Sequence, residues 1–280
     1  MTRIVVFDID GLSIRSAGCF GNVETPTPLL NEFAAQAMVF EQHYRSCTGA
    51  ADDLASAMAS FPQSIPVSHL CLDAICGENA GPPTARFGTI DQLAELLEQH
   101  LEPESVAVWV RLAARDGTLD SAVPLPLISA LVEQRVQVAI TSTSPATDPV
   151  IQDEAAIRVP LMVWTGEPSR VQTVTSTARL GDILGLTGED DDESEFAVIQ
   201  SIGRVAMRES EGLLIVSRSL LIELSEVSDE RLAEHIDMTG EQLQLFRKPE
   251  DVWNVHSVLV EEPTRGVAAL SRLRKLLPAL

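Results

Sequence analysis

Residues 4–12, with the sequence IVVFDIDGL, decide the fold class of this chain. The run from Ile4 to Ile9 is short, rich in β-branched and apolar residues, and is followed by Asp10 and Gly11, which is typical of a buried parallel strand. Such a strand delivers Asp8 and Asp10 to its C-terminal edge. Ligand sites in open α/β sheets lie at that edge, so the two carboxylates are the first candidate site residues.

Helix and strand patterns alternate on the C-terminal side of this strand. Residues 61–88, rich in Pro, Gly and Ser, are predicted to form a long connection. Apolar residues at helical spacing predict helices, and short apolar runs predict strands. The helices are expected at 27–38, 52–60, 90–101, 125–134 and 177–186, and the strands at 106–112, 136–140 and 161–164. This alternation over the first 185 residues predicts a three-layer α/β domain with a mostly parallel sheet.

A block of six acidic residues in seven, at 189–195, is the candidate domain boundary. We therefore expect an α/β domain at residues 1–190 and a small antiparallel-sheet α+β unit at 191–280. Strands of the second unit are expected at 196–202, 212–216, 219–226 and 243–246. A closing helix at 267–277 should bury Leu270, Leu273, Leu276 and Leu277 on one face.

Composition excludes several classes of function. The 280 residues are 45% hydrophobic and carry a net charge of −21, so the chain can bury a large core but repels nucleic-acid phosphates and anionic lipids. No apolar run approaches the length of a membrane helix, and residues 1–10 have no signal-peptide pattern. The expected location is the cytoplasm, with neither nucleic acid nor membrane as a partner.

Cysteine and histidine spacing does not indicate a metal site. Reduced, structural thiols are expected for Cys19, Cys47, Cys71 and Cys76. The five histidines show no metal-binding spacing and are expected mostly at the surface or in loops. They are His43, His69, His100, His235 and His256.

One short motif has a possible phosphatase interpretation. The segment Asp8-Ile9-Asp10-Gly11 after an apolar strand resembles the first motif of the haloacid dehalogenase phosphatases. That resemblance implies Asp8 as nucleophile and Asp10 as general acid around a magnesium ion, with Thr141 binding phosphate. The family's later acidic pair would have to come from residues 190–192, which no predicted strand holds.

A longer resemblance covers nearly the whole chain. Residues 4–44 resemble the N-terminus of sulfatases of the alkaline phosphatase superfamily, including the turn at 18–22 and the Thr27-Pro28 helix start. Three later segments are similar to sulfatase segments in the same order, namely 157–164, 176–188 and 240–254. This resemblance implies an alkaline-phosphatase-like α/β fold and hydrolysis of sulfuric or phosphoric esters.

The nucleophile motif of that family is degenerate here. Sulfatases mature a Cys or Ser to formylglycine within Cys/Ser-x-Pro-x-Arg, and the best register places Ala50 at the nucleophile and Leu54 at the arginine. Shifting the register brings in Cys47 without restoring the proline or arginine. Cys47 or Thr48 are therefore the catalytic candidates only if the chain is active. Asp52 and Asp53 on the next turn would repel an anionic substrate.

The metal segments are also incomplete. On the first strand, the resemblance implies Asp10 as a vestigial ligand and Asp8 as a weaker one. The second segment, after residues 136–140, offers neutral Thr143 and Ser144. A divalent cation such as calcium or magnesium, which prefers several carboxylate oxygens, is thus expected only in an active protein; no other cofactor is expected.

The sequence therefore predicts a sulfatase-like pseudoenzyme with a binding or regulatory role. Its partner would be a protein or an anionic small molecule. The alternatives are a residual sulfate or phosphate ester hydrolase, or a haloacid-dehalogenase-type phosphatase using Asp8 and Asp10. The sulfatase interpretation predicts that Asp10, Ala50 and Thr143 converge at one edge of the sheet.

Overall fold

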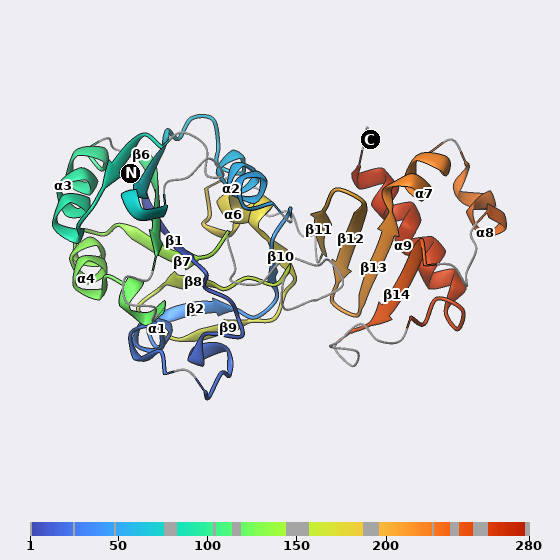
Figure 1. Ribbon diagram of the computed structural model, residues 1–280, viewed down its shortest axis with the longest axis horizontal. Helices are drawn as coiled ribbons and strands as arrows, with labels where there is room; N and C mark the ends of the chain where they lie inside the picture. Colours follow the sequence, from blue (N-terminus) through green and yellow to red (C-terminus); the bar gives the residue numbers. More distant parts are fainter. Residues whose placement is uncertain are drawn as a thin grey trace.

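The chain folds around an eight-stranded sheet and a separate four-stranded sheet (Figure 1). The computed structural model describes residues 2–24, 26–47, 49–75, 83–102, 105–113, 119–143, 157–186, 196–225, 227–235, 241–248 and 257–277. The acid block at 189–195 lies outside these ranges, so the domain division at residue 190 stays a prediction.

The central sheet has the strand order β5-β4-β6-β1-β7-β8-β2-β9. Its strands are β1 (Thr2–Asp10), β2 (Ala37–Phe40), β4 (Val67–Leu72), β5 (Ala85–Phe87), β6 (Ser105–Ala113), β7 (Gln137–Thr141), β8 (Leu161–Trp164) and β9 (Ser169–Val171). β1 pairs in parallel with β6 and β7, and only β8 runs antiparallel to its neighbours. The register places Asp8 opposite Arg111 on one side and Thr141 on the other.

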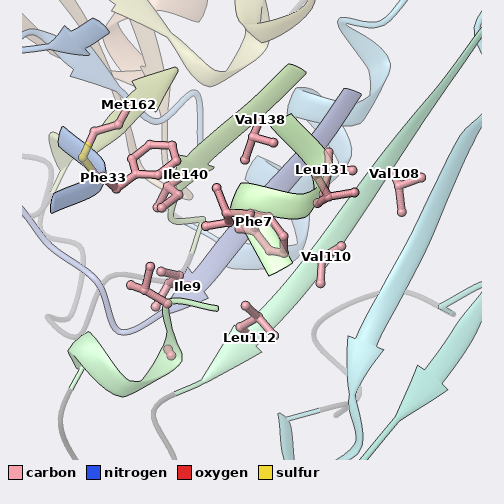
Figure 2. Packing of buried hydrophobic residues seen from close by; sticks show 14 of the residues in the cluster. Phe7, Ile9, Phe33, Val108, Val110, Leu112, Leu131, Val138, Ile140 and Met162 are labelled. Atoms are coloured by element: carbon pink, nitrogen blue, oxygen red, sulfur yellow. The ribbon is translucent and has the colours of Figure 1, made fainter. Parts of the chain in front are cut away.

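Alternating residues of β1 face two helical layers, because successive side chains of a strand point to opposite faces. Val5, Phe7 and Ile9 pack under α1 (Pro28–Ala34), α3 (Ile90–His100) and α4 (Leu125–Glu133), and Figure 2 shows Phe7 and Ile9 among residues of β6 and β7. Ile4 and Val6 pack on the other face under α2 (Ala50–Ala59) and α6 (Leu180–Ile183). The predicted three-layer, mostly parallel α/β architecture is confirmed.

The second sheet is antiparallel, in the order β11-β12-β13-β14. Its strands are β11 (Phe196–Gln200), β12 (Arg204–Glu209), β13 (Gly212–Ser217) and β14 (Leu243–Arg247). The helices α7 (Arg218–Glu223), α8 (Leu232–His235) and α9 (Pro263–Leu276) cover one face of it. In α9, Leu270 and Leu273 are buried as expected, but Leu276 is 39% exposed because it lies on the last turn.

The other face of the four-stranded sheet packs against the central domain. Tyr44, Val174, Ile199, Ile215 and Phe246 belong to one buried cluster at this junction. One member, Tyr44, belongs to the short strand β3 (His43–Tyr44), which pairs with β10 (Thr175–Ser176). Figure 1 shows β10 between the two parts.

A buried arginine adds polar contacts to that junction. Arg208 of β12 is 2% exposed, donates to the Tyr44 hydroxyl (3.0 Å) and Gln42 Oε1 (3.1 Å), and lies 5.6 Å from the centre of the Tyr44 ring. Both faces of the small sheet are therefore covered.

Several sequence-based assignments were wrong. β4 and β5 lie inside the predicted connection at 61–88. β4 was missed because polar residues such as Ser68 and His69 interrupt its apolar pattern. β2 begins at Ala37, inside the helix predicted at 27–38. The predicted strand at 219–226 is α7, which begins where the Ser217 hydroxyl accepts a hydrogen bond from the Leu220 N–H (3.2 Å). β12 was not predicted.

Within the described part of the chain, no helix is long and apolar enough to cross a bilayer.

Buried His43 predicts a pH-dependent stability. Its Nδ1 lies 2.9 Å from Thr175 Oγ1, its ring is fully buried, and burial lowers its pKa to about 3. Since an unfolded histidine has a pKa of about 6.5, the unfolded state binds more protons below that pH, and stability falls as the pH falls.

Between about pH 7 and about pH 5, His43 should cost about 2 kcal/mol of unfolding free energy. Urea denaturation of the wild type and of His43→Gln at both pH values measures this, because the variant should lose that part of the pH dependence. Equal pH dependence in the two proteins would contradict the prediction.

Candidate functional site

Asp8 is the acid at the centre of the candidate site, and its oxygens are already bound within the protein. The residue is fully buried near the end of β1. Its Oδ1 accepts from the Thr143 N–H (2.8 Å), and its Oδ2 accepts from the Thr143 hydroxyl (2.6 Å) and the Trp109 indole N–H (3.2 Å). Asp8 therefore connects β1, β6 and the segment after β7.

Asp10 lies farther out and is paired with an arginine. It is the last residue of β1, and its side chain is 36% exposed. Arg111, buried on β6, places Nη2 3.2 Å from Asp10 Oδ1. Sequence reasoning ranked Asp10 above Asp8 as a ligand, but Asp8 makes the internal contacts.

The expected nucleophile position carries no reactive group. Ala50 is the first residue of α2, after the N-cap Gly49, so only a methyl group stands at the start of this helix. Burial raises the pKa of the Cys47 thiol, with nearby Asp53 and Asp52 acting in the same direction and Ser46 and Arg45 opposing. A thiol kept protonated is a poor nucleophile. The other candidate, Thr48, lies outside the described residues.

Asp53, one of the two acids expected to repel an anionic substrate, is fully buried on α2. It accepts through Oδ1 from the Ser46 N–H (2.6 Å), the Ser46 hydroxyl (2.9 Å), the Cys47 N–H (3.3 Å) and the Thr177 hydroxyl (2.6 Å). It thus connects the loop at 45–47 to Thr177. The other acid, Asp52, is exposed.

Arg45 joins this tie to the Asp8 cluster. Its side chain is 1% exposed, with Nε 3.9 Å from Asp53 Oδ2. Its Nη2 donates to the Thr143 carbonyl (3.0 Å). The loop at 45–47 therefore contacts Thr143, the residue that binds Asp8. We call Asp8, Arg45, Asp53 and Thr143 the strand-end cluster.

Two histidines are buried, against the expectation of surface or loop positions. His43 is fully buried, and His69 on β4 is 4% exposed. Burial lowers the pKa of His69, Asp8 opposes this effect and Arg111 adds to it. His43 lies on β3 and His69 on β4, and neither strand was predicted from the sequence. Their burial follows from the packing of these strands in the core.

The haloacid dehalogenase interpretation gains no support at Thr141. Its hydroxyl donates to the Pro160 carbonyl (2.9 Å) inside the sheet and is fully buried, so it is not presented to a phosphate. The acids at 190–192, which that interpretation requires near Asp8, lie outside the described residues.

The residues present do not fit the divalent cation that the sulfatase resemblance implies. Among the described residues, no three His, Cys, Asp or Glu side chains are grouped so that they could hold a metal ion. Calcium takes six to eight oxygen ligands and magnesium six, whereas the Asp8 carboxylate is bound by three protein donors and Asp53 by four.

Comparison with known proteins identifies the fold. No protein-family model and no curated protein matches the sequence. Solved structures match over nearly the whole chain. A protein of the alkaline phosphatase superfamily from Vibrio parahaemolyticus is 12% identical, with a TM-score of 0.64 over 99% of this chain and 87% of that one.

Two further structures agree. A 2-O GAG sulfatase is 11% identical, with a TM-score of 0.61 over 99% of this chain and 91% of that one. A 6S-sulf protein from a glycosaminoglycan-metabolism locus of Bacteroides thetaiotaomicron is 10% identical, with a TM-score of 0.64 over 99% of both chains. The chain therefore has the sulfatase-type fold of the alkaline phosphatase superfamily, as the sequence resemblance implied.

Sequence reasoning missed three residues that organise the site. Trp109 and Thr177 donate to the acids, and Arg45 lies 3.9 Å from Asp53. Arg45 and Trp109 lie outside the segments that resemble sulfatases, and Thr177, inside the one at 176–188, was not singled out. Trp109 lies in the apolar strand predicted at 106–112, which concealed its indole N–H as a donor. The sequence pointed to Arg45 only weakly, as a single basic residue eight positions before Asp53.

Proposed function

We propose that this chain is a noncatalytic protein on a sulfatase-type fold and acts by binding or regulation. The observation that supports this best is the strand-end cluster, in which Thr143 binds both oxygens of Asp8, an implied metal ligand, and buried Arg45 faces Asp53. A second supporting observation is Ala50, which stands at the expected nucleophile position and has no group able to attack an ester. A shared fold does not by itself transfer an activity.

The partner class belongs to the same proposal. With a net charge of −21, the surface favours a partner with a complementary basic region, because long-range attraction steers oppositely charged surfaces together. We therefore favour a protein partner over an anionic small molecule.

Purified full-length protein should not hydrolyse aryl sulfates or aryl phosphates above background, with or without calcium, magnesium or manganese. Loss of a nucleophile alone costs on the order of 10⁶ in turnover in a well-studied hydrolase, and losing coupled groups adds little. A chromogenic ester assay with an active sulfatase as positive control measures this.

Variants assign any turnover that appears. Activity lost in both Cys47→Ala and Asp10→Ala would overturn the noncatalytic proposal in favour of a residual hydrolase. Activity lost only in Asp8→Asn would instead support Asp8 as the attacking group.

A further inference from the structure

The strand-end cluster has two fully buried carboxylates and one buried cation. Asp8 and Asp53 are both 0% exposed, and Arg45 is 1% exposed. Moving a carboxylate out of water is costly unless a positive charge or several donors compensate. Hydrogen bonds meet part of this need at each acid, and Arg45 supplies the charge.

Arg45 faces Asp53 directly and is linked to Asp8 through Thr143. One end of its guanidinium faces Asp53, with Nε 3.9 Å from Oδ2, and the other donates to the Thr143 carbonyl at 3.0 Å. The N–H and hydroxyl of the same threonine bind the two oxygens of Asp8. Thr143 therefore accepts from Arg45 through its carbonyl and donates to Asp8 through its N–H and hydroxyl.

We propose that Arg45 is the resident cation of the strand-end cluster and takes the electrostatic role that a divalent ion would have at this edge. This inference rests on the proposed noncatalytic function. An arginine side chain keeps its charge throughout the physiological pH range. A divalent ion next to it would meet a fixed positive charge in a poorly screened interior, and at Asp8 it would have to displace the donors that hold both carboxylate oxygens.

The test compares Arg45→Met with the wild type. Methionine keeps an unbranched side chain of similar reach but removes the charge, which leaves the buried carboxylates without their cation. The matched control is Arg231→Met, since Arg231 is 64% exposed and pairs with Glu234 on the surface. Thermal unfolding of all three full-length proteins is measured in EDTA and then in millimolar calcium, magnesium or manganese.

We expect the wild-type midpoint to be the same in EDTA and in each cation. Arg45→Met should unfold about 6–12 °C lower, from the loss typical of a broken buried ion pair. Added cation should recover part of this loss in Arg45→Met alone, because Asp53 Oδ2, which accepts no hydrogen bond among the described residues, then faces the space that the guanidinium has left. Arg231→Met should stay within about 2 °C of wild type.

Two outcomes would overturn the proposal: an Arg45→Met midpoint equal to that of the wild type, or the same response of both proteins to added cation. If Arg45→Met does not fold, equilibrium dialysis of the wild type against manganese decides, since one bound ion per chain contradicts a resident arginine and no bound ion supports it. These readouts need no turnover. Ester hydrolysis by a metal-free wild type would overturn the noncatalytic function alone, and metal binding without hydrolysis would overturn this inference alone.

Discussion

Gly181→Ala is expected to lower the free energy of unfolding by about 3 kcal/mol or more. A Cβ at this position would lie 2.2 Å from the backbone oxygen of Ser60 and 2.8 Å from its carbonyl carbon. Both are backbone atoms at the end of α2, so no side chain can rotate away. The Gly181 N–H also donates to the Ser60 hydroxyl (2.8 Å), and a shift of α6 would break that bond as well.

Gly203→Ala is the matched control, because no atom of the described residues lies within 4 Å of the added Cβ there. Its stability should stay within about 1 kcal/mol of wild type. Urea denaturation of the two variants measures the difference. Equal stability of the two variants would show that α2 and α6 are not packed as closely as described.

Asp53→Asn is expected to cost about 3–5 kcal/mol, although the side chain hardly changes in size. The carboxylate accepts from the Ser46 N–H and hydroxyl, the Cys47 N–H and the Thr177 hydroxyl. An amide can keep its oxygen in the place of Oδ1, but its two N–H groups then stand in the place of Oδ2 and face the Arg45 guanidinium. It also leaves Arg45 as a buried cation without its nearest acid.

The neighbouring acid provides the control for Asp53. Asp52 is exposed in the first turn of α2, so Asp52→Asn should cost at most about 1 kcal/mol, through its interaction with the helix dipole. Chemical denaturation of both variants at neutral pH separates the two roles. A similarly small loss of unfolding free energy in both variants would contradict the prediction. It would mean that the Asp53 contacts contribute little to stability.

Much of the architecture could be predicted because its signals are local. The run at 4–9 is short, β-branched and apolar, α3 and α4 have clear helical stripes, and β8 was assigned with its observed bounds. β4 was missed because an inner strand that carries Ser68 and His69 lacks the continuous apolar run of its neighbours. α7 was assigned as a strand because its leucines and isoleucine fit both periods over so short a segment.

The site could be predicted only in part. That Asp8, Asp10 and the segment after β7 lie at one edge follows from strand order. Which acid is buried does not, because Asp8 and Asp10 point to the same face and differ only in what covers them. Arg45 and Thr177 come from separate segments brought together by tertiary packing. A local sequence pattern does not record contacts between residues that are far apart in the chain.

The doubly covered four-stranded sheet has a consequence for any attempt to divide the protein. A cut between residues 186 and 196 would bare Tyr44 and Val174 on one fragment and Ile215 and Phe246 on the other. It would also strip Arg208 of Tyr44 and Gln42. Each fragment would carry an adhesive apolar surface of the kind that promotes aggregation. Insertions, tags and fusions should therefore be placed away from this junction. Partner-binding assays should use the undivided chain.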